Sequence, residues 1–263
     1  MRFRRIRSMG LTAVLAALLV AELAAGLSAA GLAAPQANTG TASDQQIEAT
    51  LRQEFAAKSA LRAVTVAVRG GVATLAGSVP DYRAWLEANH RARQVRGVIG
   101  VVDQLRVNAT SVPDAQLQRL LAQRLEYDRI GMGQIFNNLT LEVHDGMVVV
   151  GGQVASYADR DSALDIIADT PGVRGVQDRI TVAPTSINDD RIRFLAARAI
   201  YGNPTLLKYR IDPAHPIRIV VANGRIRLEG VVNSQLDKTV AGNAARSVPG
   251  VFGVQNNLVV AKN

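Results

Sequence analysis

The side chains best suited to acid–base or metal chemistry are too scattered in this sequence to form a site. The chain has no cysteine and three histidines: His90, His144 and His215. They fall in an expected helix, beside a turn and in a proline-rich stretch, so neither a metal set nor a base–nucleophile pair is indicated. The aspartates Asp159, Asp161 and Asp165 lack the spacing of a calcium loop, and a solvated acidic face explains them. We therefore expect no enzymatic activity, no metal and no cofactor.

Binding chemistry is better represented, by arginines that fall into two groups. The candidate contact residues for a membrane or a partner are Arg218, Arg225 and Arg227 in one group, and Arg91, Arg93 and Arg96 in the other. The first group would share the outer face of a hairpin and could meet an anionic leaflet, or form a solvated face with Arg218 paired to Glu229. The second group would end a helix, where cations also suit the helix dipole.

Trp85 is the third candidate contact, and it is the only tryptophan in the chain. In the repeat described next it aligns with Arg160 and Lys238, so we expect its side chain to point toward solvent. A tryptophan in that position could seat in a membrane interface. The alternative is that it packs under a neighbouring module.

A triplicated module positions these residues. Three turn glycines each precede a second glycine by 26 positions, with no insertion or deletion between them: Gly71 and Gly97, Gly146 and Gly172, Gly224 and Gly250. Further matches occur at offsets 4, 6, 30 and 34 from each turn glycine, such as Gly77, Gly152 and Gly230 at offset 6. Self-similarity at a fixed spacing is typical of tandem domains.

Within each copy the pattern predicts helix, strand, tight turn, strand, helix, strand. Ser43 and Gln46 resemble a capping box that begins the first helix. Gly70-Gly71, Asp145-Gly146 and Asn223-Gly224 are dipeptides suited to type I′ hairpin turns, which require positive φ at both positions. Counting outward from these turns gives one apolar face in each hairpin: Val64, Val66, Val68, Ala73 and Leu75; Leu139, Leu141, Val143, Val148 and Val150; Ile217, Ile219, Val221, Ile226 and Leu228.

The copies differ most between their first helix and first strand. Relative to the first copy this segment is five residues longer in the second and eight longer in the third. The third insert, Tyr201–Pro216, is rich in proline and should be rigid. Such loops either carry specificity or cover the hairpin edge.

The N-terminus has the order of a secretory signal peptide. Arg2, Arg4, Arg5 and Arg7 precede an apolar stretch and then small residues, which predicts cleavage between Ala30 and Ala37. A retained anchor is the alternative, but Glu22 and the many alanines make a weak span. Without a cysteine no lipoprotein anchor can form, so we expect a periplasmic or otherwise secreted protein.

Charge is spread unevenly over the chain. The leader contributes four arginines and one glutamate, a charge of +3, so +5 of the formal +8 remains after it. Residues 44–108 carry nine basic and six acidic side chains (+3), residues 113–182 six and ten (−4), and residues 186–260 ten and five (+5). Opposite signs could let neighbouring modules pack together, or the basic modules could face an anionic surface.

The pattern of each copy resembles the BON domain, named for bacterial osmotically inducible periplasmic and nodulation proteins. The third copy matches the family's closing motif most fully, from Pro249-Gly250-Val251 through Val254 and Asn256 to Leu258. In the second copy Asp178 and Arg179 replace the asparagines, and in the first Arg96 replaces the proline. The resemblance implies an αββαβ fold, an envelope location, no enzymatic activity, and binding of phospholipid or envelope partners under stress.

We therefore predict an α+β protein of three tandem αββαβ modules, each with a three-stranded mixed sheet and two helices on one face. The expected segments are a signal peptide over 1–33, a flexible linker over 34–43, and modules over 44–108, 113–182 and 186–261. The leading function is peripheral association with anionic phospholipid; the alternative is a protein-interaction scaffold. Each copy also has a G-x-x-G loop like that of nucleic-acid-binding KH domains, but its middle residues are mostly apolar. We expect no nucleic acid and no small-molecule substrate, and the oligomeric state stays open.

Overall fold

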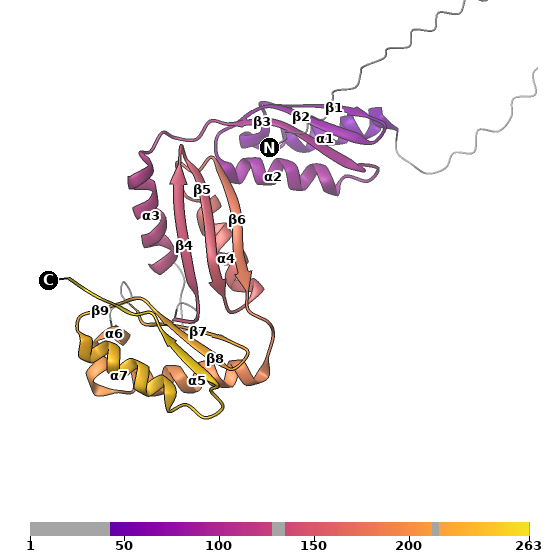
Figure 1. The fold of residues 1–263 in the computed structure, drawn as a ribbon. Coiled ribbons are helices and arrows are strands. Elements are labelled where there is room, and N and C mark those ends of the chain that lie inside the picture. The colour runs from indigo at the N-terminus through magenta and orange to yellow at the C-terminus, as the bar shows by residue number, and fades with distance from the viewer. Residues whose placement is uncertain (1–42, 128–134, 212–215, 263) are drawn as a thin grey trace, which may run out of the picture. The chain divides into compact units, whose positions relative to one another are not determined.

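The computed structural model describes residues 43–127, 135–211 and 216–262. Three modules follow one another in the chain, and each has the element order helix, strand, strand, helix, strand (Figure 1). The predicted fold class, three tandem αββαβ modules, is confirmed. The predicted signal peptide and nearly all of the linker after it lie outside the described residues.

The first module begins with helix α1 at a capping box between Ser43 and Gln46, as predicted. A single 3₁₀ turn, η1, separates this helix from the first strand. Its elements are α1 (Asp44–Ala56), η1 (Ser59–Leu61), β1 (Val64–Arg69), β2 (Val72–Val79), α2 (Tyr82–Gln94) and β3 (Gly100–Val107).

The second module repeats the order helix, strand, strand, helix, strand. Its elements are α3 (Asp114–Tyr127), β4 (Asn138–His144), β5 (Met147–Val154), α4 (Tyr157–Ala168) and β6 (Gly175–Val182).

The third module adds two short helical turns and divides its second and last strands. Its elements are α5 (Ile187–Tyr201), η3 (Pro204–Leu206), α6 (Lys208–Ile211), β7 (Arg218–Ala222), β8 (Arg225–Glu229), β9 (Val231–Val232), α7 (Gln235–Arg246), β10 (Gly253–Asn256) and β11 (Val259–Val260).

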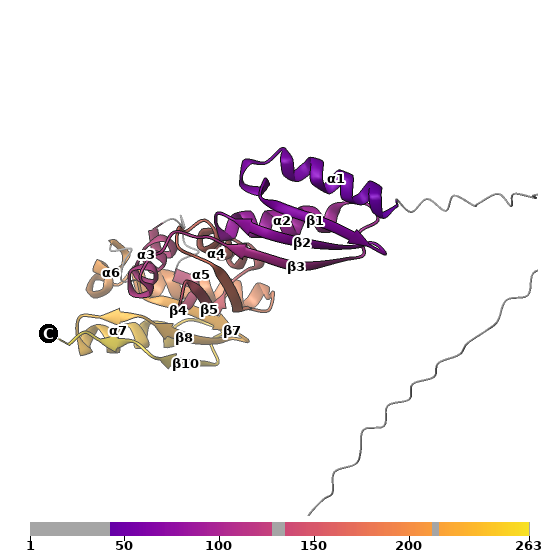
Figure 2. The same cartoon turned by 90° about the horizontal axis from the view of Figure 1, so that it is seen from above.

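Each sheet has the hairpin's second strand in the middle. The hairpin strands pair antiparallel, and the last strand pairs parallel to the middle one, giving the orders β1-β2-β3, β4-β5-β6 and β7-β8-β10. In the third module β9 and β11 continue the parallel pairing beyond the break. The long helices of each module lie on one face of its sheet (Figure 2). Within the described residues, no helix of the same module lies on the other face of its sheet.

The predicted apolar faces form the cores. All five inward residues of the first hairpin and all five of the third are buried. In the second, Val143, Val148 and Val150 are buried, while Leu139 and Leu141 are half-buried against the same core. The hairpins also have the predicted turns, since Asp145 and Asn223 adopt positive φ together with the glycines that follow them.

The glycine six positions after each turn is required by close packing of two backbones. Gly77, Gly152 and Gly230 have positive φ, at 109°, 96° and 123°. A Cβ atom there would lie only 2.3, 2.0 and 2.7 Å from the carbonyl oxygens of Ala63, Asn138 and Pro216, respectively. In the third module this glycine divides β8 from β9.

The described part of the third insert belongs to the core. Leu206 and Tyr209 are buried, and the Tyr209 hydroxyl donates to Asp237 Oδ2 at 2.8 Å while accepting from Asn233 N at 2.7 Å. Lys208 Nζ also lies 2.9 Å from Asp237 Oδ2. These contacts favour the expectation that the insert is a structural cover.

Candidate functional site

The outer face of the third hairpin carries the predicted arginines. Three cross-strand pairs place their outward side chains on this face: Arg218 with Glu229, Val220 with Arg227, and Ala222 with Arg225. The alternate residues of both strands are buried in the core on the other face. The shared face predicted for Arg218, Arg225 and Arg227 is therefore present.

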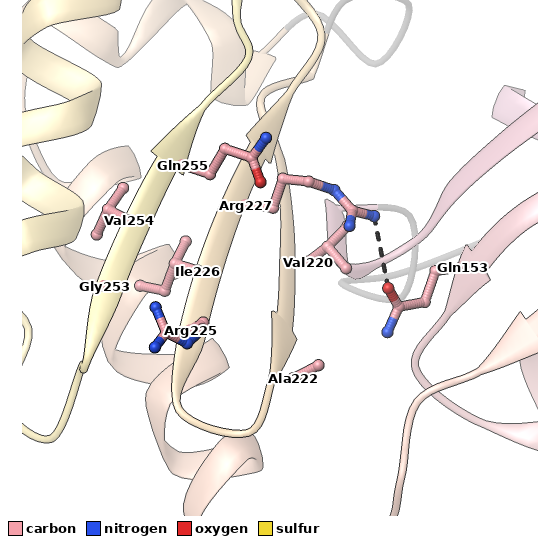
Figure 3. Close-up of a pocket in the computed structure, with 9 residues that line it drawn as sticks. All are labelled: Gln153, Val220, Ala222, Arg225, Ile226, Arg227, Gly253, Val254 and Gln255. Carbon is pink, nitrogen blue, oxygen red and sulfur yellow. Dashed lines mark hydrogen bonds between the residues drawn. The ribbon is translucent and has the colours of Figure 1, made fainter.

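A pocket of about 410 Å³ opens on this face (Figure 3). Its polar side chains are Arg225, Arg227, Gln153 and Gln255, and the backbone of Gly253 forms part of its wall. Gln153 comes from β5 of the second module. No carboxylate is among the residues that line the pocket, so its charged groups are both cationic.

Arg225 is the more available of the two cations. Its side chain is exposed, and it makes no ion pair with any residue in the described part of the chain. Its strand partner on β10 is Gly253. A Cβ atom at Gly253 would lie 3.1 Å from Arg225 Nη1, so the glycine leaves room for the guanidinium against the strand.

Arg227 is partly neutralised. Its Nε lies 2.8 Å from Glu229 Oε1, and its Nη2 donates to Gln153 Oε1 at 3.4 Å (Figure 3). Glu229 also accepts from Asn257 Nδ2 at 2.8 Å. The Arg227 guanidinium is thereby fixed at the boundary with the second module, and it contributes less free charge than Arg225.

Arg218 is engaged elsewhere. Its Nη2 lies 3.0 Å from Glu126 Oε1 on α3, and both side chains are about one-quarter exposed, at 26% and 27%. The alternative pairing of Arg218 with Glu229 is wrong, because Glu229 binds Arg227, two positions along its own strand. Val220, between these arginines, is 4% exposed although it lies on the face expected to be open. Part of this face is thus covered.

Trp85 does not point into solvent as predicted. It is half-buried, packs against the core of the first module and stacks on Tyr82, with ring centroids 5.3 Å apart and an interplanar angle of 14°. Tyr82 in turn packs against the core of the second module, and burial raises the pKa of its hydroxyl. The alternative, that Trp85 packs under a neighbouring module, is not met either, because Trp85 packs against its own module and it is Tyr82 that contacts the second.

The second arginine group is only partly free. Arg91 is half-buried and pairs with Glu87, its Nη2 2.8 Å from Oε1. Arg93 and Arg96 are exposed at the C-terminal end of α2 and make no ion pair with described residues.

Opposite charges meet where modules adjoin. Arg83 Nε lies 2.6 Å from Asp169 Oδ1, and its Nη1 lies 2.9 Å from Asp165 Oδ1. Its Nη2 also donates to the Asp165 carbonyl at 3.0 Å. The hydrogen bond to Asp169 is the main cause of a raised pKa at Arg83. The Asp165 side chain is 66% exposed, as expected for a solvated acidic face, and it also pairs with a cation of the first module. These pairs favour the interpretation that opposite module charges serve packing.

The sequence reasoning missed a set of aspartates that hold the hairpin turns. One carboxylate at the start of the first helix accepts two turn amides in each module: Asp44 from Gly70 and Gly71, Asp114 from Asp145 and Gly146, Asp189 from Asn223 and Gly224. The donor–acceptor distances run from 2.7 to 3.0 Å. An aspartate near the beginning of every first helix was the available signal.

The predicted structural glycines occupy the expected corners. Gly71, Gly146 and Gly224 close the hairpins, while Gly97, Gly172 and Gly250 turn the chain from the second helix toward the last strand, all with positive φ. The G-x-x-G loops therefore join helix to strand, as expected.

Neither a metal site nor a membrane span is found within residues 43–127, 135–211 and 216–262. No three histidine, aspartate or glutamate side chains there are grouped to hold an ion. No helix in the same ranges is long and apolar enough to cross a bilayer. His215 lies outside the described residues.

Comparison with known proteins gives one family. The family model of the BON domain matches residues 43–109, 113–184 and 205–262. A search of curated proteins found no match. Among solved structures, the C-terminal domain of CdsD, the structural protein of the type III secretion system of Chlamydia trachomatis, is 15% identical, with 83% of this chain and 96% of that chain covered and a TM-score of 0.24. A second CdsD structure is also 15% identical, with 82% and 91% covered and a TM-score of 0.23.

Proposed function

The chain belongs to the BON domain family, and from this premise we propose that it is a non-enzymatic protein of the bacterial envelope that associates peripherally with anionic phospholipid. The observation that carries the proposal is Arg225, an exposed cation that forms no ion pair with a described residue and lies in a pocket that no carboxylate lines. An envelope location and a role in osmotic or other envelope stress rest on the family resemblance and on the leader pattern.

The pocket suits the phosphate group of a lipid. A guanidinium offers several N–H donors to phosphate oxygens, and Gln153 and Gln255 add amide donors beside it. Each basic side chain near an anionic leaflet contributes about 1 kcal/mol, so Arg225 and Arg227 together supply only weak, salt-sensitive binding. Peripheral and reversible association is the outcome that this charge supports.

The contact is assigned to the third module's arginines rather than to Trp85. The stacking on Tyr82 and the packing against its own core give Trp85 a structural role. Arg218 and Arg91 are likewise engaged, with Glu126 and Glu87. Arg93 and Arg96 remain as a secondary basic patch on the first module.

Co-sedimentation with vesicles tests this proposal. The exported, processed chain is mixed with phosphatidylcholine vesicles, with and without phosphatidylglycerol, at about 0.01 M and about 0.15 M salt, where the Debye length is about 30 Å and about 8 Å. We expect pelleting only with phosphatidylglycerol, weakened by salt and by the R225Q and R225Q/R227Q variants.

A matched control removes the same charge from the same module. Arg191 and Arg198 are exposed on α5, away from the pocket, so R191Q/R198Q lowers the net charge equally. If both double variants weaken pelleting alike, binding follows net charge and the pocket is not the site. No pelleting of the unsubstituted chain under any condition would overturn lipid association and favour a protein-interaction scaffold, to be sought as a defined oligomer or a co-purifying protein.

A further inference from the structure

The corner where each last strand begins holds one residue in the same way in all three modules. Two positions after the glycine that ends the second helix's loop, a backbone N–H donates to the carbonyl of the hairpin-turn glycine. The pairs are Ile99 to Gly71 at 2.9 Å, Arg174 to Gly146 at 2.9 Å, and Phe252 to Gly224 at 2.8 Å. The backbone of this corner residue is therefore fixed to the tip of the hairpin.

The side chain of the corner residue lies over the turn glycine. A Cβ atom on Gly224 would be 2.5 Å from Phe252 Cδ2, and one on Gly71 would be 3.2 Å from Ile99 Cγ1. On the other side there is solvent, since Ile99 is 80% exposed and Phe252 75%. Each of these two apolar side chains thus packs on a turn glycine with one side and is exposed to solvent on the other.

Folding does not require an apolar residue at this corner. The second module has Arg174 there, also exposed, with its Cγ 3.1 Å from the equivalent Cβ position on Gly146. The same backbone bond and the same packing on glycine are made with a charged side chain. Ile99 and Phe252 therefore expose apolar surface to water, and this exposure does not stabilise the core.

Unpaired arginines accompany both apolar corners. In the third module Arg225 directly follows the turn glycine that Phe252 covers. In the first module Arg69 precedes the turn and Arg96 precedes the loop, and both are exposed. None of the three forms an ion pair within the described ranges. The nearby acid of each tip, Asp44 or Asp189, is occupied by the turn amides.

We infer that Phe252 and Ile99 are apolar anchors that enter the interfacial region of an anionic bilayer, while the adjoining arginines contact lipid phosphates. This inference rests on the proposed function and names the apolar residues that would insert into the lipid. A single apolar side chain beside free cations suits a leaflet, where apolar burial and charge attraction add together. It offers little area for a protein interface, which needs a contiguous buried patch.

The single tryptophan of the chain allows a direct test by fluorescence. In a W85F background, F252W and I99W each create one reporter at an apolar corner, and R174W creates the matched reporter at the second module's corner. Phosphatidylglycerol vesicles should shift the emission of the first two to shorter wavelength, and brominated lipid should quench it. The R174W reporter should change little.

Loss of the apolar groups gives a second readout. F252S and I99S should each weaken partitioning onto phosphatidylglycerol vesicles about tenfold, from the apolar area lost. Unlike the loss in R225Q, this loss should persist at high salt. Circular dichroism should remain unchanged, since both side chains are largely exposed.

The two proposals fail in different ways. If the unsubstituted chain pellets with vesicles but the F252W and I99W reporters keep their emission, the anchor inference is overturned and lipid association stands. If the unsubstituted chain does not pellet, both fall. A shift at R174W equal to that at F252W would also overturn the anchor inference, because it would show that the second module's corner, where Arg174 normally lies, approaches the bilayer as closely as the two apolar corners do.

Discussion

Replacing Asp189 by alanine should destabilise the third module far more than the equivalent change destabilises the first. The Asp189 carboxylate accepts from Asn223 N at 2.8 Å and from Gly224 N at 2.7 Å, and the residue is 2% exposed. Asp44 makes the same two bonds, at 2.7 and 2.8 Å, but it is half-buried and its bond to Gly70 is exposed. Water can reach the Gly70 amide that D44A leaves, whereas the Gly224 amide that D189A leaves is buried.

The difference can be put in numbers. A buried amide left without a partner costs about 1–3 kcal/mol, so the buried Gly224 amide and the part-buried Asn223 amide together give about 3 kcal/mol for D189A. Where water replaces the carboxylate the loss is about 1 kcal/mol, the net value of an ordinary hydrogen bond. Since about 1.4 kcal/mol is a factor of ten, opening of the hairpin should become about 100-fold more frequent in D189A and about fivefold in D44A.

Hydrogen exchange read by mass spectrometry follows each hairpin separately. A peptide covering residues 217–229 reports on D189A, and one covering residues 64–79 reports on D44A. N188A is the control, because Asn188 is exposed on the same turn of α5 and should leave exchange unchanged. If D189A accelerated exchange no more than D44A does, the burial of the Asp189 bonds would not be what stabilises this turn.

Three further results are expected. G77A should lower the free energy of unfolding by at least about 3 kcal/mol, because its Cβ would lie 2.3 Å from a neighbouring backbone oxygen. The Cβ of G70A meets nothing within 4 Å, so this variant should lose only the about 1–2 kcal/mol of left-handed strain. Urea unfolding followed by Trp85 fluorescence compares the two variants within the first module. Backbone hydrogen bonds from Asp145 and Gly146 lower the pKa of the Asp114 carboxyl. The stability that this carboxylate contributes is therefore complete above its unfolded pKa of about 3.9 and is lost as pH falls through the folded pKa. D114N should make urea midpoints less dependent on pH in that acidic range, and an unchanged pH profile would contradict this. R83A should lower the free energy of unfolding by no more than about 1 kcal/mol, because the Arg83 side chain is 39% exposed. It should nevertheless speed proteolysis of the segment 108–113 between the first two modules, and the control R62A should not.

The repeat, the turns and the core faces could be predicted because each depends on local rules. A type I′ turn needs positive φ at two adjacent residues, and once it is placed, strict alternation assigns every hairpin side chain to a face. Two buried sets follow from that count alone: Val64, Val66 and Val68 in the first hairpin, and Ile217, Ile219 and Val221 in the third.

The contacts between modules could not be predicted in the same way. Arg83 and Asp169 are 86 positions apart, and no periodicity relates them. Charge sums predict the sign of each module but not the partner of any one side chain. Hairpin register offers Arg218 only Glu229 as an alternative partner, and the arginine pairs instead with Glu126 of the second module. Trp85 was misplaced for the same reason: the alignment with Arg160 and Lys238 does not register the stacking on Tyr82.

The parallel pairing of each last strand sets an order of events for a chain that emerges N-terminus first. A hairpin such as β1–β2 can form in about 1–10 μs, but the module's sheet is complete only when β3, its final segment, has appeared. For a chain exported while it is synthesised, at about 5–20 residues per second, the roughly 70 residues of the second module take several seconds to follow, which is longer than many small mixed domains need to fold. The first module can therefore fold before Asp165 and Asp169 have emerged. Arg83 then lies on the surface of a folded module, where the second module can dock against it.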